Sequence, residues 1–321
     1  MLGDSSESLK ILQSIAIRAT AMRPGPESPR HRVKAAARLC SDPIIEVFLK
    51  CRQGGSTMLS RYAEGDLLVS LDDGVVTAVF NRPASRNALT FEMYAKLATL
   101  CTEAAQDEAV RAIILTGAGD KAFAAGTDIA QFLDFKSPAD GLAYEKRMEE
   151  ALEPVERCPK PIIAAIAGAC TGGGAAIAAC CDLRIATADL RFGVPIARSL
   201  GNTLSIANYR RLLALLGPSR LKNLIFTARL IDAQEAQAIG LLTDVVAHAA
   251  ELMPRARALA KQLLSHAPLS LKACKESLRR LQAESERATD EDLVSEVYGS
   301  ADFREGMAAF LAKRTPQWTG R

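Results

Sequence analysis

The sequence predicts an α/β fold in which most strands pair in parallel. Between residues 67 and 200, short aliphatic and β-branched runs alternate with longer segments of helical hydrophobic periodicity. Such alternation is typical of a parallel sheet covered by helices. After about residue 200 the pattern becomes mostly helical. We therefore expect a sheet-containing core followed by a helical region.

The first expected elements form a hairpin followed by a helix. Leu67–Leu71 and Val75–Asn81 predict two strands, and Asp72-Asp73-Gly74 between them is a favourable hairpin turn. Thr90 is a suitable cap for a helix that runs to about Gln106. The remaining elements of the core are strands at 112–116, 161–167 and 183–187 and helices at 141–157 and 175–181.

The later elements are expected to be helices. Gly240 ends one of them, as glycine often does in the left-handed conformation after a helix. The expected helices are 206–216, 218–226, 232–239, 250–265, 268–282, 290–298 and 304–313.

The longest apolar stretch, Pro161 to Cys181, has the length of a membrane span. Three consecutive glycines interrupt it, however, and Asp182 and Arg184 follow at once. A buried strand, a turn and a buried helix explain the stretch better.

The composition is that of an ordinary globular protein. Of 321 residues, 49% are hydrophobic and 24% are charged, and the formal net charge is +3. This charge is too small to favour nucleic acid or a membrane as a partner, and the basic residues form no long stripe with aromatic ones. The length allows one large domain or two smaller ones.

The eight cysteines indicate neither a metal site nor a disulfide framework. No pair has C-x-x-C spacing and no histidine lies near a pair, so we expect no zinc. Cys180 and Cys181 lie in an apolar run and are interpreted as small core residues. A nucleophilic cysteine would need a base, and none of the three histidines is near one in sequence. Since no secretory signal is visible, we expect a cytoplasmic protein.

Residues 1–57 differ in composition from the rest of the chain. They contain several prolines, many basic residues and Gly54-Gly55, and Met58 follows. We expect either a disordered extension or an upstream start codon that is not used in the native protein. Its Arg and Ser content favours a transit peptide, whereas its acidic residues disfavour one.

Two glycine-bearing turns are the strongest functional signal. They occupy Lys121–Ile129 and Gly168–Ala176, and each follows a strand-like run and opens into a helical pattern. The first N–H groups of a helix have no partner within it, and the helix dipole adds partial positive charge there. Two such turns can aim two backbone N–H groups at one point and form an oxyanion hole. The alternative is that Gly172–Gly174 only permits tight strand-to-helix packing.

The ordered series of motifs resembles the enoyl-CoA hydratase/isomerase (crotonase) superfamily over residues 66–318. The motifs are Asn81-Arg-Pro83, Arg86-Asn87-Ala88-Leu89, Val110-Arg111, Ala122–Ile129, Lys160-Pro161, Gly172-Gly173-Gly174, Cys181-Asp182-Leu183, Phe192-Gly193-Val-Pro195, Phe226–Ala236, Gly240-Leu241-Leu242 and Glu305–Arg314. The resemblance implies a spiral of ββα units in residues 58–255, which holds an acyl-CoA site. It also implies a helical trimerisation region in residues 256–321 and a homotrimer or homohexamer.

The resemblance also implies a reaction and its site. The Thr127 and Gly173 N–H groups would hold the thioester oxygen of an acyl-CoA as an enolate forms. The thioester is the substrate, and no cofactor would be bound permanently. The implied CoA-binding residues are Arg86, Asn87, Ala88, Leu89, Ala124, Gly126, Asp128, Ile129 and, from a neighbouring subunit, Lys313. For Arg86 and Lys313 the alternative is a solvated surface charge.

The chain departs from the family pattern at both acid/base positions. Hydratases of the family use two glutamates, but this chain has Ala176 and Ile196 at those positions. Neither side chain can transfer a proton, so a conventional hydratase mechanism is in doubt. The overall resemblance still favours a hydratase. The alternatives are an isomerase, decarboxylase or C–C lyase on the same fold, or a CoA-thioester binding protein without catalysis.

Two segments offer replacements for the missing glutamates. After Ile196, the residues Arg198, Ser199, Asn202 and Thr203 could bind a carboxylate or carbonyl of the acyl group, although Arg198 could instead form a salt bridge between subunits. After the first glycine turn, some family members place an acid or base. For the acids there, we expect a solvated helix face rather than a catalytic role. These acids are Asp134, Glu145, Glu149 and Glu150. Outside both segments, Tyr209 and Tyr298 are further candidates.

Overall fold

The computed structural model describes residues 62, 64–283 and 291–319. All of the described residues belong to one compact unit. The extension predicted for residues 1–57 lies outside the described residues.

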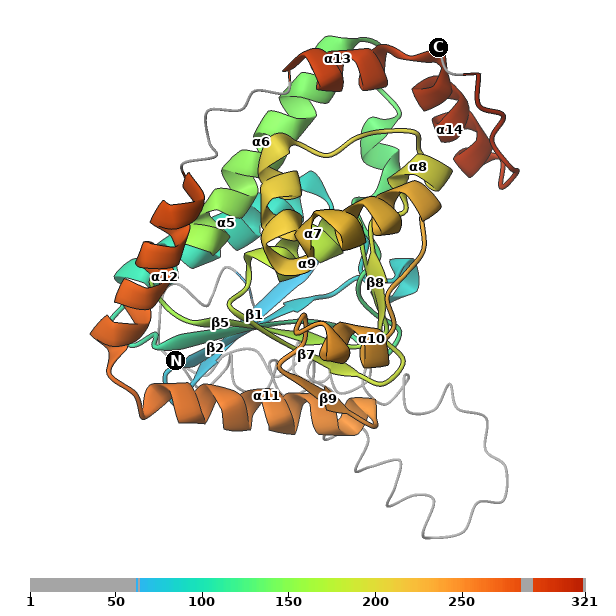
Figure 1. Ribbon diagram of the computed structural model, residues 1–321. Helices are drawn as coiled ribbons and strands as arrows, with labels where there is room; N and C mark the ends of the chain where they lie inside the picture. Colours follow the sequence, from blue (N-terminus) through green and yellow to red (C-terminus); the bar gives the residue numbers. More distant parts are fainter. Residues whose placement is uncertain (1–61, 63, 284–290, 320–321) are drawn as a thin grey trace, which may run out of the picture. The chain divides into compact units, whose positions relative to one another are not determined.

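A six-stranded sheet forms the centre of the described unit (Figure 1). Its first two strands are antiparallel and the other neighbours are parallel, which confirms the predicted α/β class. In spatial order the strands are β1 (Leu67–Asp72), β2 (Val75–Phe80), β3 (Ala112–Gly117), β5 (Ile162–Ile166), β7 (Leu183–Thr187) and β9 (Asp244–Val246). In the β1–β2 turn, Asp73 and Gly74 have φ angles of 47° and 78°, as the predicted hairpin requires.

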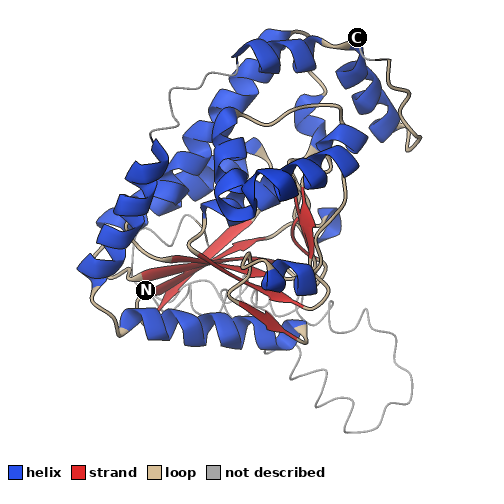
Figure 2. Ribbon diagram, viewed as in Figure 1, coloured by secondary structure: helices blue, strands red, loops and turns tan. Residues whose placement is uncertain are grey.

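A second sheet of three short parallel strands lies beside the first (Figure 2). It consists of β4 (Ala122–Ala124), β6 (Ala169–Thr171) and β8 (Arg191–Gly193). Strands of three residues are too short to show a hydrophobic period, so they were not predicted. They matter because β4 and β6 lead directly into the two glycine turns.

Helices cover both faces of the central sheet (Figure 1). On one face α11 (Ala249–Leu264) packs its buried residues Leu252, Ala256 and Leu259 against β3, β5 and β7. On the other face lie α5 (Phe91–Gln106), α6 (Pro138–Arg157), α7 (Gly173–Cys180) and α9 (Ile206–Thr227). The predicted boundary at residue 255 falls inside α11, which belongs to the core by its packing.

Several helices begin and end where the sequence predicts. The Thr90 hydroxyl accepts a hydrogen bond from Met93 N–H at the start of α5. The helices predicted on either side of Gly217 join as α9, with a kink at Gly217, whose φ is 70°. The short elements are η1 (Pro83–Ser85), η2 (Ile129–Phe132), α8 (Ile196–Ser199) and α10 (Ala233–Ala238).

The C-terminal part is helical, as predicted. It comprises α12 (Pro268–Ala283), α13 (Glu291–Gly299) and α14 (Ala301–Leu311). The start of α6 and the end of α13 meet closely, since a methyl group on Gly141 would lie 2.3 Å from Cγ of Tyr298. Tyr298 also packs with Phe303 and Phe132 in a small apolar cluster. No helix in the described ranges is long and apolar enough to cross a membrane.

Candidate functional site

The two glycine turns meet because their strands are neighbours. Cα positions of Ala122 in β4 and Ala169 in β6 are paired, and both strands run in the same direction into their turns. The Thr171 hydroxyl donates to the Ala125 carbonyl at 3.0 Å and joins the turns. Gly172 has φ of 53°, and a methyl group on it would lie 3.4 Å from Cα of Gly126. This close approach, in a conformation that favours glycine, explains the glycine at position 172.

Both predicted oxyanion-hole residues line one cavity of about 400 Å³. Leu89 N–H donates to Gly126 O, and Asp128 N–H donates to Leu89 O, both at 2.8 Å. These bonds fix the peptides around Thr127, whose own N–H has no acceptor within the described part of the chain. Gly173 is the first residue of α7, so its N–H has no acceptor inside the helix. The two residues that carry these backbone donors therefore line the same cavity.

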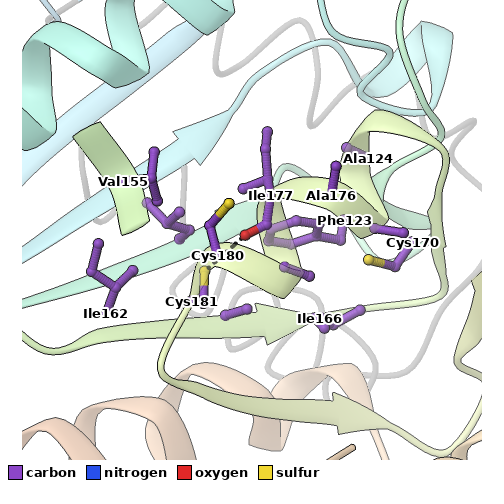
Figure 3. Close-up of a cluster of buried hydrophobic side chains, with 14 of the residues drawn as sticks. Phe123, Ala124, Val155, Ile162, Ile166, Cys170, Ala176, Ile177, Cys180 and Cys181 are labelled. Carbon is purple, nitrogen blue, oxygen red and sulfur yellow. Dashed lines mark hydrogen bonds between the residues drawn. The ribbon is translucent and has the colours of Figure 1, made fainter. Parts of the chain in front are cut away.

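The wall of the cavity formed by α7 and α8 has no ionisable side chain at the family's two acid/base positions. Ala176 and Ile196 both line the cavity and are 6% and 7% exposed. Figure 3 shows Ala176 on α7 beside an apolar cluster that includes Ile177, Phe123 and Cys180. Burial raises the pKa of the Cys180 thiol to about 12, so it stays protonated at neutral pH as the core residue that the sequence predicts.

Glu145 of α6 provides a carboxyl group inside the same cavity. It is 6% exposed and lines the cavity together with Thr127 and Gly173. Its Oε1 accepts a hydrogen bond from the Tyr298 hydroxyl at 2.8 Å, and its Oε2 accepts one from Ser205 N–H at 2.9 Å. The interpretation of Glu145 as part of a solvated helix face is therefore wrong. Its position in the helical period could have indicated burial, because Glu145 shares the buried face of α6 with Gly141, Met148, Leu152 and Val155.

The other three acids of this segment have different surroundings. Glu149 accepts from Arg211 at 2.6 and 2.8 Å, and the same buried guanidinium also contacts Glu156. This pairing engages Glu149, one turn from Glu145, in an ion-pair cluster outside the cavity. Asp134 and Glu150 are exposed and do not line the cavity, as a solvated face requires.

The residues predicted after Ile196 are only partly in the cavity. Ser199, Asn202 and Thr203 line it, whereas Arg198 is exposed and does not. The Ser199 hydroxyl donates to Pro195 O at 2.9 Å, and the Asn202 amide donates to the Tyr298 hydroxyl at 3.4 Å. Neither candidate tyrosine lines the cavity, but the Tyr298 hydroxyl donates a hydrogen bond to Glu145, which does.

The residues with an implied CoA role also divide into two groups. Those that line the cavity are Arg86, Ala88, Gly126, Asp128 and Ile129, and those that do not are Asn87, Leu89, Ala124 and Lys313. Asn87 is fully buried, and its amide donates to Ala118 O at 3.0 Å and to Ala122 O at 2.7 Å. Its side chain thus holds the loop before α5 against the strand β4, and Arg86 stands exposed at the edge of the cavity.

Two tyrosines of the cavity escaped the sequence analysis. Tyr94 of α5 and Tyr144 of α6 line the cavity, and both hydroxyls lie within hydrogen-bond distance of Oγ1 of Thr127, at 3.0 and 3.1 Å. Tyr94 lies on the apolar face of its helix with Met93 and Leu97, so its spacing indicated only a core position.

Comparison with known proteins agrees with the fold. The family model described as enoyl-CoA hydratase/isomerase matches residues 71–321. A crotonyl-CoA hydratase of Syntrophomonas wolfei is 34% identical over 252 residues, which cover 78% of this chain and 96% of that protein.

Two solved structures show the same architecture. An enoyl-CoA hydratase/isomerase from Pseudoalteromonas atlantica matches with a TM-score of 0.70 and 31% identity, covering 79% of this chain and 100% of that one. A methylmalonyl-CoA decarboxylase in complex with 2-nitronate-propionyl-CoA matches with a TM-score of 0.72 and 31% identity, covering 81% and 100%. The predicted resemblance and the crotonase fold are confirmed. The chain is an enzyme that belongs to the enoyl-CoA hydratase/isomerase family.

Proposed function

We propose that this enzyme adds water to the double bond of a 2-enoyl-CoA and uses Glu145 as its single acid and base. The observation that carries the proposal is the position of Glu145. It lines the cavity that Thr127 and Gly173 also line, whereas Ala176 and Ile196 provide no carboxyl group there. The identity with a crotonyl-CoA hydratase supports a short enoyl chain as the substrate.

One carboxyl group is sufficient for the complete reaction. The Glu145 carboxylate takes a proton from water while the water oxygen bonds to Cβ. The electron pair of the double bond moves to the thioester oxygen, where the two N–H groups hold the enolate. Glu145 then returns the same proton to Cα, and the thioester carbonyl forms again. Because one group serves both carbons, we expect hydrogen and hydroxyl to add to the same face.

The hydrogen bonds to Glu145 suit this role. The Tyr298 hydroxyl and Ser205 N–H bind different carboxyl oxygens and come from α13 and from the residue that caps α9. They orient the carboxyl group, because each bond fixes a different one of its two oxygens. Tyr298 belongs to the described C-terminal helices, so those helices contribute to the site as well as to packing.

Substrate binding and assembly follow from the family membership as further proposals. Arg86 at the edge of the cavity would contact a phosphate of CoA, and Lys313 would reach CoA bound to a neighbouring subunit. A trimer or hexamer in the cytoplasm is proposed on the same basis. Exposed apolar side chains on and beside α9 support subunit contact, among them Ile206, Leu213 and Phe226.

A second candidate reaction is isomerisation of a 3-enoyl-CoA to a 2-enoyl-CoA. The Glu145 carboxyl group favours isomerisation, because it could take a proton from Cα and return it to Cγ without any water. The intermediate would be a dienolate rather than the enolate of hydration, but in both reactions the negative charge develops on the thioester oxygen, so the same oxyanion hole would serve.

The wild-type enzyme tests the proposal in D₂O with crotonyl-CoA and 3-hexenoyl-CoA, each followed by mass spectrometry. Hydration of crotonyl-CoA with one deuterium at Cα supports the hydratase. Conversion of 3-hexenoyl-CoA alone supports the isomerase. Tight binding of both thioesters with neither hydration nor exchange at Cα would contradict both reactions and indicate a binding protein.

A further inference from the structure

Three hydroxyl groups form a continuous chain at the oxyanion site. Oη of Tyr94 and Oγ1 of Thr127 are 3.0 Å apart, and Oγ1 of Thr127 and Oη of Tyr144 are 3.1 Å apart. The three side chains come from α5, the first glycine turn and α6, and all three residues line the cavity. Different parts of the fold therefore converge on Thr127, whose N–H is one of the two backbone donors.

The Tyr94 end of this chain lies against the other backbone donor. A methyl group on Gly173 would lie 1.9 Å from Oη of Tyr94 and 3.1 Å from Oγ1 of Thr127. The glycine at position 173 thus leaves room for the Tyr94 hydroxyl directly beside the residue whose N–H would hold the thioester oxygen. Tyr94 itself is 2% exposed, so its hydroxyl has little access to bulk water.

The hydroxyl chain formed by Tyr94, Thr127 and Tyr144 has one proton more than it has hydrogen bonds. Burial raises the pKa of Tyr94 and of Tyr144, so both phenols stay protonated at neutral pH. With Thr127 the chain carries three hydroxyl protons, but it contains two hydrogen bonds. Whichever way the donors point, one proton lacks an acceptor among the described residues. A buried donor without a partner is costly, which favours a ligand oxygen at this place.

We propose that this hydroxyl chain supplies a third hydrogen bond to the thioester oxygen, donated by Tyr94 and reinforced through Thr127 by Tyr144. The inference rests on the proposed function, since a third donor accelerates the reaction by stabilising the enolate. It also predicts a property of the bound substrate before any reaction, namely a more strongly polarised thioester carbonyl.

Tyr94→Phe tests the proposal, because it removes the hydroxyl and keeps the ring. Loss of one donor at an oxyanion hole lowers kcat by about 100-fold or more, and with two donors remaining we expect a loss of about 10-fold to 100-fold. KM for crotonyl-CoA should change by less than about 3-fold. Tyr144→Phe should lower kcat less than Tyr94→Phe, since it removes only the far end of the chain. Tyr62→Phe is the matched control, because its hydroxyl donates to Lys96 O and the residue does not line the cavity.

The infrared carbonyl stretch of bound [1-¹³C]crotonyl-CoA separates this proposal from the proposed function. It should lie at higher wavenumber in Tyr94→Phe than in the wild type, and Tyr62→Phe should match the wild type. An active wild type with unchanged kcat and unchanged stretch in Tyr94→Phe would overturn the third donor alone. An inactive wild type that still shows the difference in stretch would overturn the reaction and keep the donor. If Tyr94→Phe does not fold, Thr127→Val compared with Thr127→Ser gives the same contrast, because only serine retains the hydroxyl.

Discussion

The residues of α7 and α8 that line the cavity include no ionisable side chain, whereas those of α6 include the carboxyl group of Glu145 and the hydroxyl group of Tyr144. Ala176 lies on α7 and Ile196 on α8. In the proposed reaction, α7 carries one of the backbone donors for the thioester oxygen and α6 carries the group that moves the proton. A chain that lacks the family's usual acids would in this way keep an acid and base in the cavity.

Glu145→Gln removes the carboxyl group that α6 contributes to the cavity, and we expect it to have the largest effect. Glutamine keeps the size of the side chain and its hydrogen-bonding capacity but cannot transfer a proton. We expect kcat for hydration, or for isomerisation if that is the reaction, to fall by about 10²- to 10⁴-fold. Glu150→Gln, an exposed position on the same helix, is the control and should keep full activity. Activity within about 3-fold of the wild type in Glu145→Gln would show that α6 does not carry the proton.

A substitution at Gly173, the first residue of α7, tests the backbone donors. In Gly173→Ala the new methyl group would lie 1.9 Å from Oη of Tyr94, so the tyrosine or the turn must move. We expect a loss of about 100-fold in kcat, since displacing one donor costs about that much. The double variant with Tyr94→Phe should have a higher melting temperature than Gly173→Ala alone, because the hydroxyl that clashes is gone. Equal melting temperatures would mean that the clash does not occur.

Two substitutions together can move the carboxyl group from α6 to α7. Ala176→Glu places an acid at the family's first acid/base position, and the residue already lines the cavity. In the Glu145→Gln background we expect it to restore part of the hydration rate, about 10-fold. Ala176→Gln in the same background is the control. No gain over that control would show that the α7 wall cannot position an acid against the substrate.

The smallest expected effect lies outside the cavity lining. Thr90 caps α5, the helix that carries Tyr94, through its bond to Met93 N–H at 3.2 Å. Thr90→Ala should lower the free energy of unfolding by about 1 kcal/mol, which chemical denaturation can measure. We expect kcat to stay within about 2-fold, because the packing of α5 rather than its cap places Tyr94. A large loss of kcat would mean that the end of α5 controls the site.

The fold was largely predictable because its elements are long and locally specified. The β1–β2 turn, the Thr90 cap and the period of α6 each followed from a few neighbouring residues. The strands β4, β6 and β8 did not, since three residues show no period and their pairing depends on distant parts of the chain. The short sheet is nevertheless what brings the two glycine turns together.

The sequence indicated only the backbone half of the proposed site. Glycine spacing and motif order indicated Thr127 and Gly173, because backbone conformation leaves a local signature in the sequence. The side-chain half depends on tertiary contacts. Glu145 follows the period of a buried helix face, yet Tyr298 and Ser205, which bond to its carboxyl group, lie more than fifty residues away in the sequence. Tyr94 and Tyr144 converge on Thr127 from two helices, and no local pattern joins them.

A crystal structure of the Glu145→Gln variant with bound crotonyl-CoA tests most directly whether Glu145 transfers the proton. We predict that the thioester oxygen lies within about 3.2 Å of Thr127 N and Gly173 N, and that the substituted side chain on α6 lies within about 3.5 Å of Cα or Cβ of the acyl group. A thioester bound with its oxygen between these two donors, but with its Cα and Cβ turned away from α6, would contradict the central claim that Glu145 moves the proton.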